Sequence, residues 1–250
     1  MIDSEIVLAT TNDLAKPFEF KKVVISKRVG GYWDSMMATN PYILKAEDKY
    51  ILYYIGSPDG KLSTRSIGYA VCESIDGEWR RSDKPINLPK DANNPAVLYD
   101  RGKYLLYFRD GNLKVSVAEA KDYNQPYSIL KYDIFPDAKI EDMFVYKDKN
   151  GKFIILAEDN DGYYTGVTKG GVKFESENAV DWKLADDPLV YDFQVKCGDG
   201  KVLYLDRRER PFLLFDDNST YLFTAVKADG DTVLTGGKTW NMVQKIKNVL

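Results

Sequence analysis

Carboxylate side chains stand directly before two apolar, strand-like segments of this 250-residue chain. Glu141 and Asp142 precede the run MFVY, and Glu209 precedes RPFLLF. The chain contains no histidine, which excludes Ser-His-Asp and Cys-His catalysis, histidine metal sites and a histidine general base. Acid–base chemistry at neutral pH would therefore rest on carboxylates, Tyr or Lys.

The carboxylates occupy one point of a sequence phrase that occurs four times. In each copy a polar or acidic residue and Pro or Met lead into an apolar run, a polar turn and a second apolar run. The copies begin at Thr39, Asn93, Glu141 and Glu209, and they are 54, 48 and 68 residues apart. Repeats of about 40–50 residues with four strands each are typical of β-propellers.

Each repeat predicts one four-stranded antiparallel sheet. Two apolar strands come first, and their turn is clearest at Asn150 and Gly151, because Asn-Gly favours a β-hairpin. A third strand is expected near 66–74, 113–121 and 165–176, followed by an exposed fourth strand. No segment shows a convincing helical period over ten residues, and the C-terminal NMVQKIKNVL fits a short helix or a final strand equally well.

The N-terminal segment 5–26 matches the third and fourth strands of a repeat, without the first two. We therefore predict a single all-β domain over residues 1–250, a five-bladed β-propeller with four-stranded antiparallel blades and a partial first blade. Unpaired strands in that blade would be exposed to edge pairing. The missing strands would come from a longer chain or from a partner, such as a second copy in a homo-oligomer. The predicted partial blade is 1–30, and the full blades are 31–90, 91–138, 139–198 and 199–250.

The composition limits the kinds of molecule that this chain is expected to bind. The net charge is −3 and the charges are scattered, which argues against nucleic acid. No apolar segment approaches the roughly 18 residues that span a membrane, so no membrane partner is expected. The N-terminal residues lack a signal peptide, which fits a cytoplasmic protein or one processed after export. Cys72 is expected to be a small buried residue, and a disulfide with Cys197 stays open.

Four phrases together resemble the five-bladed propeller glycoside hydrolases of family 43 and its relatives in families 117 and 32. They are NPAVLYDRGKYLLYF, IGYAVCESIDGEW, IEDMFVYKDKNGKF and ERPFLLFDD, and the resemblance covers most of residues 5–245. In that family the inner strands direct a general base, a pKa-modulating Asp and a Glu general acid into a central funnel. The resemblance implies hydrolysis of an oligo- or polysaccharide without a cofactor. Inversion is the outcome when the acid and base lie roughly 6.5–9.5 Å apart.

The resemblance implies Asp142 as the modulator and Glu209 as the general acid, with Glu141 as the alternative acid. The corresponding positions of the two earlier repeats are Asn40 and Asn94, which cannot act as acid or base. Both Asn side chains are expected to face the funnel, where they cap the strands or bind substrate.

The general base has two candidate positions, the missing inner strand of the first blade or Asp34. A chain without the base would be a poor hydrolase. Trp33 is expected either to stack on a sugar face or to pack within its blade. Arg208 and Arg210 either pair with carboxylates and hold sugar hydroxyls at the funnel rim or form part of a solvated charge run.

Asp159 and Asp161 resemble a calcium loop only faintly, because the remaining ligands are lacking, so a solvated turn and no metal site are expected. Three functions remain in competition. A glycoside hydrolase comes first. A non-catalytic carbohydrate-binding propeller comes second, because Asn replaces acid at two inner-strand positions. An interaction scaffold comes third, since a fold alone does not fix a function.

Overall fold

The computed structural model describes residues 4–216, 219–228 and 238–246. The chain divides into two compact units, Met1–Ile134 and Phe135–Leu250, which are described separately as unit 1 and unit 2. Within the described ranges the units consist of β-strands and one short 3-10 helix, η1, at Leu62–Thr64. No helix in these ranges has the length and apolar character needed to cross a membrane.

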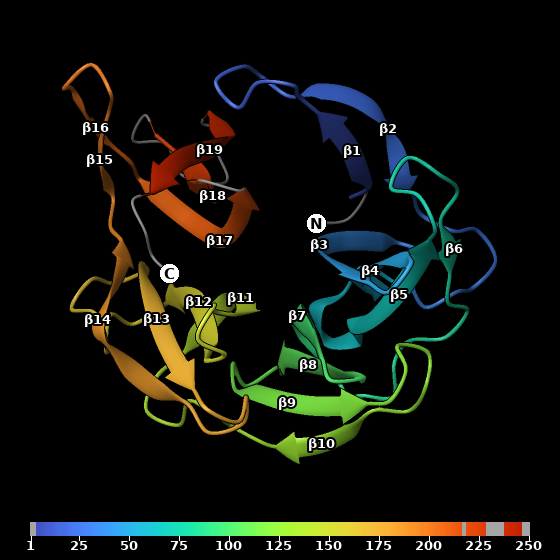
Figure 1. Cartoon of the computed structure of the whole chain (residues 1–250). Coiled ribbons are helices and arrows are strands. Elements are labelled where there is room, and N and C mark those ends of the chain that lie inside the picture. Colours follow the sequence, from blue (N-terminus) through green and yellow to red (C-terminus); the bar gives the residue numbers. More distant parts are fainter. Residues whose placement is uncertain (1–3, 217–218, 229–237, 247–250) are drawn as a thin grey trace. The chain divides into compact units, whose positions relative to one another are not determined.

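Unit 1 contains three antiparallel sheets in its described part (Figure 1). The first sheet pairs β1 with β2, and the second and third each have four strands in chain order. The strands are β1 (Ile6–Thr10), β2 (Glu19–Ile25), β3 (Met37–Ala46), β4 (Lys49–Ser57), β5 (Ser66–Cys72), β6 (Arg80–Arg81), β7 (Asn93–Asp100), β8 (Lys103–Arg109), β9 (Val115–Ala120) and β10 (Ser128–Lys131).

Unit 2 contains a four-stranded sheet, a two-stranded sheet and a three-stranded sheet in its described part. All their strand pairs are antiparallel. The strands are β11 (Ile140–Lys147), β12 (Phe153–Asp159), β13 (Gly170–Ser176), β14 (Lys183–Tyr191), β15 (Gln194–Lys196), β16 (Val202–Tyr204), β17 (Arg207–Asp216), β18 (Ser219–Lys227) and β19 (Thr239–Ile246).

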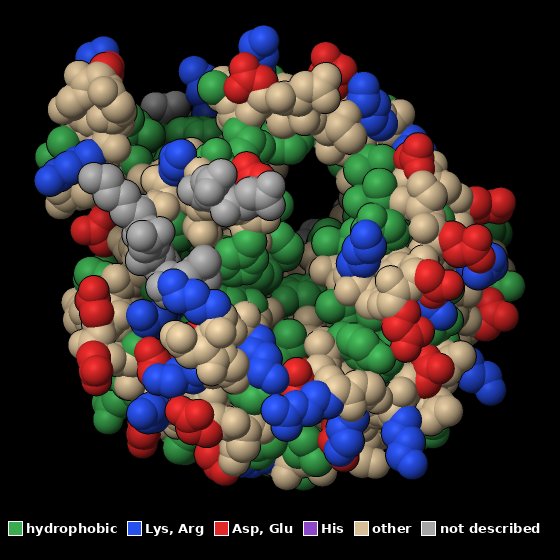
Figure 2. Space-filling model, in the orientation of Figure 1, with side chains coloured by type: hydrophobic (Ala, Val, Ile, Leu, Met, Phe, Trp, Pro, Cys, Tyr) green, Lys and Arg blue, Asp and Glu red, His purple; other side chains and the backbone are tan. Residues whose placement is uncertain are grey.

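The second strand of each four-stranded sheet is the most deeply buried. In β4 the run from Ile51 to Ser57 is buried without a break, and in β12 all seven residues are buried. Such strands have continuously apolar sequences because both of their faces are covered. The outer strand β10 alternates between exposed and partly covered positions, and in the outer strand β14 only Ala185 and Tyr191 are buried, which explains their mixed sequences. Figure 2 shows Lys and Arg side chains interspersed with Asp and Glu on the visible surface.

The predicted blades are recovered in part. Residues 5–26 form the two-stranded sheet β1–β2, and four larger sheets follow along the described chain: β3–β6, β7–β10, β11–β14 and β17–β19. These four sheets are the blades of the structure, so the predicted count of five is not confirmed. Residues 241–246 belong to strand β19, which decides against the helix alternative, while 247–250 lie outside the described residues.

One irregularity recurs in the first strand of all four larger sheets. The pairing register shifts at the same repeat position in each, by a β-bulge. A bulge re-aims the side chains beside it. The residue within each bulge has a positive φ: Asn40 (49°), Asn94 (49°), Asp142 (52°) and Arg210 (58°). Asn and Asp adopt this left-handed conformation more readily than Arg does, so the backbone at Arg210 is the most strained of the four.

Candidate functional site

Three carboxylates of unit 2 converge on one point. Asp142 lies in β11, Glu158 in β12 and Glu209 in β17. One carboxyl oxygen from each residue lies within 4.8 Å of the other two. The structure therefore brings two of the predicted catalytic residues together and adds Glu158 as a third. Three oxygens at this separation can share a proton, and their spacing also suits a hard cation with oxygen ligands.

The bulges explain how these side chains meet. Glu141 pairs with Glu158 across β11 and β12, whereas Glu209 pairs with Ala225 across β17 and β18. The repeat position of Glu209 is thus that of Glu141, and Asp142 corresponds to Arg210. The alignment of Glu209 with Asn40 and Asn94 is therefore wrong by one residue, because the equivalent pairs are Asn93 with Arg109 and Thr39 with Ile55.

Burial dominates the electrostatics of Asp142. Its side chain is only 6% exposed, and removal from water raises its pKa from 3.8 to about 7. The Arg210 guanidinium, whose Nη1 lies 3.4 Å from Asp142 Oδ1, opposes this rise. The negative charges of Glu141, Glu158 and Glu209 add to it. Asp142 is therefore the carboxyl group of this cluster that keeps a proton close to neutral pH.

Glu209 is the more accessible member, with 27% of its side chain exposed. Its carboxylate lies 3.4 Å from Arg207 Nη1 and 3.8 Å from Arg210 Nε. It also lines a pocket of about 440 Å³ on the sheet β17–β19, together with residues of β18 and β19. Of the three clustered carboxylates, Glu209 is therefore the one that lines this pocket.

Glu158 was not identified from the sequence, because it ends an apolar run that fits a buried strand. It is buried, and its Oε1 accepts a hydrogen bond of 2.6 Å from Lys169 Nζ. The same ammonium donates to Asn160 Oδ1 at 2.9 Å, and Asn160 Nδ2 donates to Glu141 Oε2 at 3.1 Å. Burial raises the pKa of Glu158, and Lys169 works against that rise. A polar chain thus supports Glu158 and Glu141 from one side.

The loop that carries Lys169 is organised by Asp159. This carboxylate is fully buried and accepts backbone hydrogen bonds from Tyr163, Tyr164 and Thr165 at 2.8–3.1 Å. The expectation of a solvated turn is therefore wrong for Asp159, because its buried carboxyl oxygens accept the hydrogen bonds of the loop's amide groups. Asp161 is half exposed and pairs with Lys139 at 3.8 Å.

Arg208 lies apart from the carboxylates, in a buried setting. Its guanidinium carbon lies 4.7 Å from the centre of the Tyr191 ring. It donates to Thr224 Oγ1 at 3.4 Å and to the backbone oxygen of Asp192 at 3.3 Å. These contacts support a role in packing β17 against the end of β14, whereas Arg210 contacts the carboxylate cluster directly.

In unit 1, Asp34 is fully buried and closely paired. Arg28 Nε lies 2.8 Å from its Oδ1, and Arg81 Nη1 lies 3.5 Å from its Oδ2. Tyr54 donates its hydroxyl to Oδ2 at 2.6 Å, and burial together with this bond raises the pKa of Tyr54. Two guanidinium groups and a hydroxyl fix the position of this carboxyl group by hydrogen bonds, so these contacts support a structural role for Asp34.

Trp33 also belongs to the core of unit 1. Its indole lies directly over two glycines, and a Cβ added at Gly56 or Gly68 would come within 2.3 or 2.2 Å of the ring. Its Nε1 donates to the backbone oxygen of Ser82 at 3.2 Å. Of the two alternatives for Trp33, these contacts support packing within the blade.

The predicted pair Asn40 and Asn94 is brought together in unit 1. Asn40 Nδ2 donates to Asn94 Oδ1 at 2.8 Å, which joins the bulges of β3 and β7. Thr39 Oγ1 donates to Asn40 Oδ1 at 3.2 Å. The two amides therefore satisfy one another at the position that Asp142 and Arg210 occupy in unit 2.

Comparisons with known proteins add to this geometry. No family model and no curated protein matches the sequence. Solved structures do match. A thermostable family-43 glycoside hydrolase has a TM-score of 0.57 at 19% identity, covering 76% of this chain and 64% of that chain. A family 117 glycoside hydrolase produced by the marine bacterium Zobellia galactanivorans has a TM-score of 0.68 at 17% identity, covering 96% and 68%.

A family-43 β-xylosidase/α-arabinofuranosidase from a compost microbial metagenome has a TM-score of 0.65 at 16% identity, covering 100% of this chain and 81% of that chain. The chain is an all-β propeller. The propeller spans less than two thirds of the first of these proteins, at 64%. At these identities the likeness establishes the fold and leaves the chemistry to the residues of the site. Three of the four blades in the described residues are four-stranded antiparallel sheets, and the fourth, β17–β19, has three strands.

Proposed function

We propose that this propeller is a glycoside hydrolase that acts on an oligo- or polysaccharide by carboxylate acid–base catalysis. The observation that carries the proposal is the convergence of Asp142, Glu158 and Glu209 within 4.8 Å. Carboxylates this close cannot all ionise without strong repulsion, so the cluster retains a proton that a general acid can donate. The structural neighbours, which are glycoside hydrolases, support the same class of reaction.

In this proposal Glu209 donates the proton to the glycosidic oxygen, because its side chain lines an open pocket. Asp142, whose side chain is only 6% exposed, takes the role of the modulator, while Arg210 bridges the two carboxylates. Glu141, held by Asn160, stays the alternative acid. The reacting proton is thus passed within one cluster of coupled carboxyl groups.

The base lies outside this cluster. Inversion needs roughly 6.5–9.5 Å between acid and base to leave room for water. Asp142 and Glu158 approach Glu209 more closely than that, so they act on the acid instead of activating water. Asp34 is fully buried among its donors, and we assign it no step. We propose that the base comes with strands of a partner that extend the sheet β1–β2 into a fifth blade, and that the reaction inverts.

Hydrolysis tests this function directly. The propeller would be assayed on a panel of aryl glycosides and plant or algal oligosaccharides, beside Glu209→Gln and Asp142→Asn. Loss of the general acid lowers kcat by about 10²–10⁴-fold. The matched control is Asp216→Asn, an exposed acid on the same strand β17, which keeps wild-type turnover.

The second candidate is a carbohydrate-binding propeller without catalysis. The mutually satisfied pair Asn40 and Asn94 favours it, because no acid stands at the bulge positions of unit 1. Sugar binding by calorimetry without turnover of any glycoside would support this candidate and contradict the hydrolase. Absence of both turnover and binding would instead favour an interaction scaffold.

A further inference from the structure

The pocket beside Glu209 has a pattern of charge that acid catalysis does not use. Three rows of residues cross the sheet β17–β19 near its start. Arg207 pairs with Lys227, and Lys227 pairs with Thr239. Two positions along, Glu209, Ala225 and Asn241 form an equivalent row. Side chains of directly paired residues project from the same face of a sheet, as do residues two apart in a strand.

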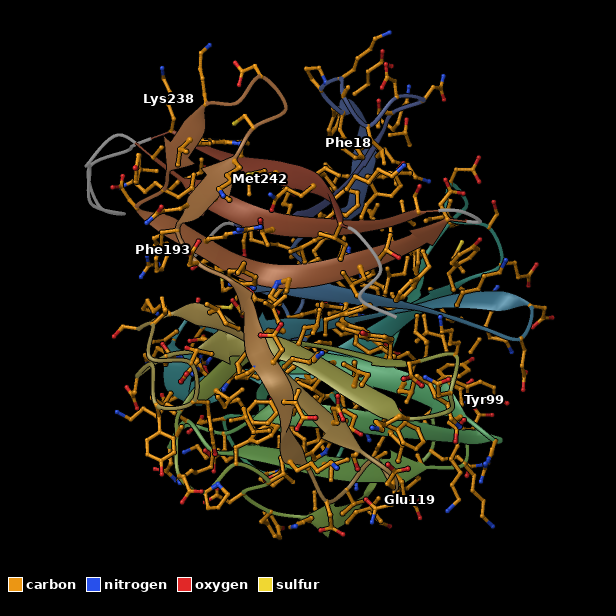
Figure 3. The ribbon with its side chains drawn as sticks, turned by 60° about the vertical axis from the view of Figure 1, so that its left-hand side comes forward. Phe18, Tyr99, Glu119, Phe193, Lys238 and Met242 are labelled. Carbon is orange, nitrogen blue, oxygen red and sulfur yellow. The ribbon has the colours of Figure 1, made fainter. Side chains whose placement is uncertain are left out.

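These two rows therefore share one face, and the Arg207–Glu209 ion pair of 3.4 Å agrees with that. All six residues line the pocket of about 440 Å³. Ala225 has the smallest side chain of the set and sits between Glu209 and Asn241, which leaves space in the middle. The row between them is Arg208, Val226 and Trp240. Val226 belongs to an apolar cluster against which Phe193 and Met242, both labelled in Figure 3, are packed, and Val226 and Trp240 also border the pocket.

Lys227 is the unusual member. It is only 4% exposed, and within the described residues no acidic group forms an ion pair or hydrogen bond with its ammonium. A buried charge without a counter-charge is costly. Arg207 stands directly opposite on β17, and like charges in that position destabilise a sheet. Glu209 is the acidic residue of the pocket lining, and it is already in contact with two guanidinium groups.

We propose that this pocket binds the carboxylate of a uronic acid residue of the substrate, with Arg207 and Lys227 holding it between them. The guanidinium group offers the planar fork that matches a carboxylate, and the ammonium supplies a compact second charge. Thr239 and Asn241 are placed to hydrogen-bond sugar hydroxyls. The inference rests on the proposed function for the sugar class, and it makes the substrate an acidic saccharide.

Binding of monosaccharides tests the inference without turnover. Galacturonate and galactose, which differ only in the carboxylate, would be titrated into the whole chain by calorimetry and by amide NMR shifts. We expect galacturonate to bind at least about tenfold more tightly than galactose, because a hydrogen bond to a charged group contributes about 1.5–3 kcal/mol. The preference should weaken as NaCl is raised. Equal binding of the two sugars, or binding of neither, would overturn the proposal.

Variants locate the site. Lys227→Met, which keeps the length of the buried side chain, and Arg207→Gln should each reduce galacturonate affinity by about tenfold or more. The matched control is Lys201→Met in the same unit, where the side chain is 83% exposed, and it should leave the affinity unchanged. A lowered thermal unfolding temperature would reveal that Lys227→Met is misfolded. In that case the galacturonate affinity of Arg207→Gln, which changes a more exposed side chain of the pocket, decides whether the proposal stands. Galactose 6-sulfate binding without galacturonate binding would overturn the carboxylate assignment.

Glu209→Gln separates this inference from the proposed function. Removing one negative charge from the pocket should preserve or strengthen galacturonate binding while it abolishes hydrolysis. Binding that depends on Lys227, with no glycoside hydrolysed, would leave the anion site standing and refute the hydrolase. Hydrolysis that depends on Glu209, with no preference for acidic sugars, would refute the anion site alone.

Discussion

The two units share a β-bulge in the first strand of each larger sheet, but the residues in the bulges differ in chemistry. In unit 1 the bulges of β3 and β7 hold Asn40 and Asn94, whose amides bond each other at 2.8 Å. In unit 2 the bulges of β11 and β17 hold Asp142 and Arg210, and neighbouring Glu side chains crowd the pair. The repeated bulge places polar side chains at the same point of each sheet. The residue types there decide whether these side chains only hydrogen-bond each other or form a carboxyl cluster with a raised pKa.

The units also treat a buried carboxylate differently. Asp34 in unit 1 is surrounded by two guanidinium groups and the Tyr54 hydroxyl. Asp142 in unit 2 has one guanidinium at 3.4 Å and several carboxylates around it. The first arrangement surrounds the carboxyl group with hydrogen-bond donors, whereas in the second burial raises the pKa of Asp142. The comparison predicts that mutations in unit 1 act on stability and that mutations in unit 2 act on protonation and turnover.

The largest stability effect should come from Asp34→Ala. It leaves Arg28 and Arg81, whose side chains are 16% and 15% exposed, without their common buried partner, although Arg28 keeps Asp83. Breaking a fully buried ion pair costs about 3–5 kcal/mol, which is the upper bound here. Urea unfolding would measure the loss, with Asp13→Ala as the control because its ion pair with Lys16 is exposed. A change within about 0.5 kcal/mol, as at ordinary surface sites, would contradict the structural assignment.

Asp142 should make unit 2 lose stability as the pH rises. Its pKa is raised from 3.8 to about 7 in the folded chain, so the folded state holds the proton more tightly than the unfolded state. The stabilisation is present in full below pH 3.8 and is lost through about pH 7. At 1.36 kcal/mol per pKa unit the loss is about 4 kcal/mol. The free energies of unfolding of the wild type and Asp142→Asn would be measured across this window. The wild type should lose stability relative to Asp142→Asn as the pH rises, and a constant difference between the two proteins would refute the shift in pKa.

A smaller effect is expected at Gly68 in unit 1. A Cβ there would lie 2.2 Å from Trp33, so Gly68→Ala forces the indole to move and costs about 1–3 kcal/mol. Gly198→Ala is the control, since nothing lies within 4 Å of its added Cβ. Denaturant midpoints would compare the two variants. Equal midpoints would show that the Trp33 site adapts freely and would weaken its assignment to the core.

The smallest effect on stability should come from Arg210→Asn. Its φ of 58° suits Asn better than Arg, so we expect a gain of at most about 1 kcal/mol. The same change removes the cation that opposes the rise in the pKa of Asp142, so that pKa should climb further. Unfolding and carboxyl NMR would be measured together. A lower pKa for Asp142 in this variant would contradict the role of Arg210.

The strands and repeat could be predicted because they depend on local patterns. The apolar runs of β4 and β12, the turn at Asn150 and Gly151 and the recurring Pro or Met each leave a signal within a few residues. Residues 5–26 were recognisable as a strand pair for the same reason. The number of blades was harder, because the strand pair at 5–26 alone does not say whether it belongs to a further blade, and the structure shows four larger sheets.

Site residues could be predicted only where their type differs between corresponding positions of the sequence repeat. Asp142 and Glu209 stood out because they replace Asn or Thr at corresponding positions. Glu158 did not, since its place in the cluster depends on pairing with Glu141 across a hairpin. The surroundings of Asp34 were equally hidden, because Arg81 comes from a strand 47 residues further along the chain.

The central claim is that Asp142 and Glu209 belong to one proton-sharing cluster. Carboxyl carbon NMR of the whole chain, titrated from pH 3 to 9, tests it without a substrate. We predict that Asp142 titrates near pH 7 and that Glu209→Gln lowers its pKa, because a neighbouring negative charge is removed. An Asp142 that titrates near pH 4 in both proteins would contradict the account.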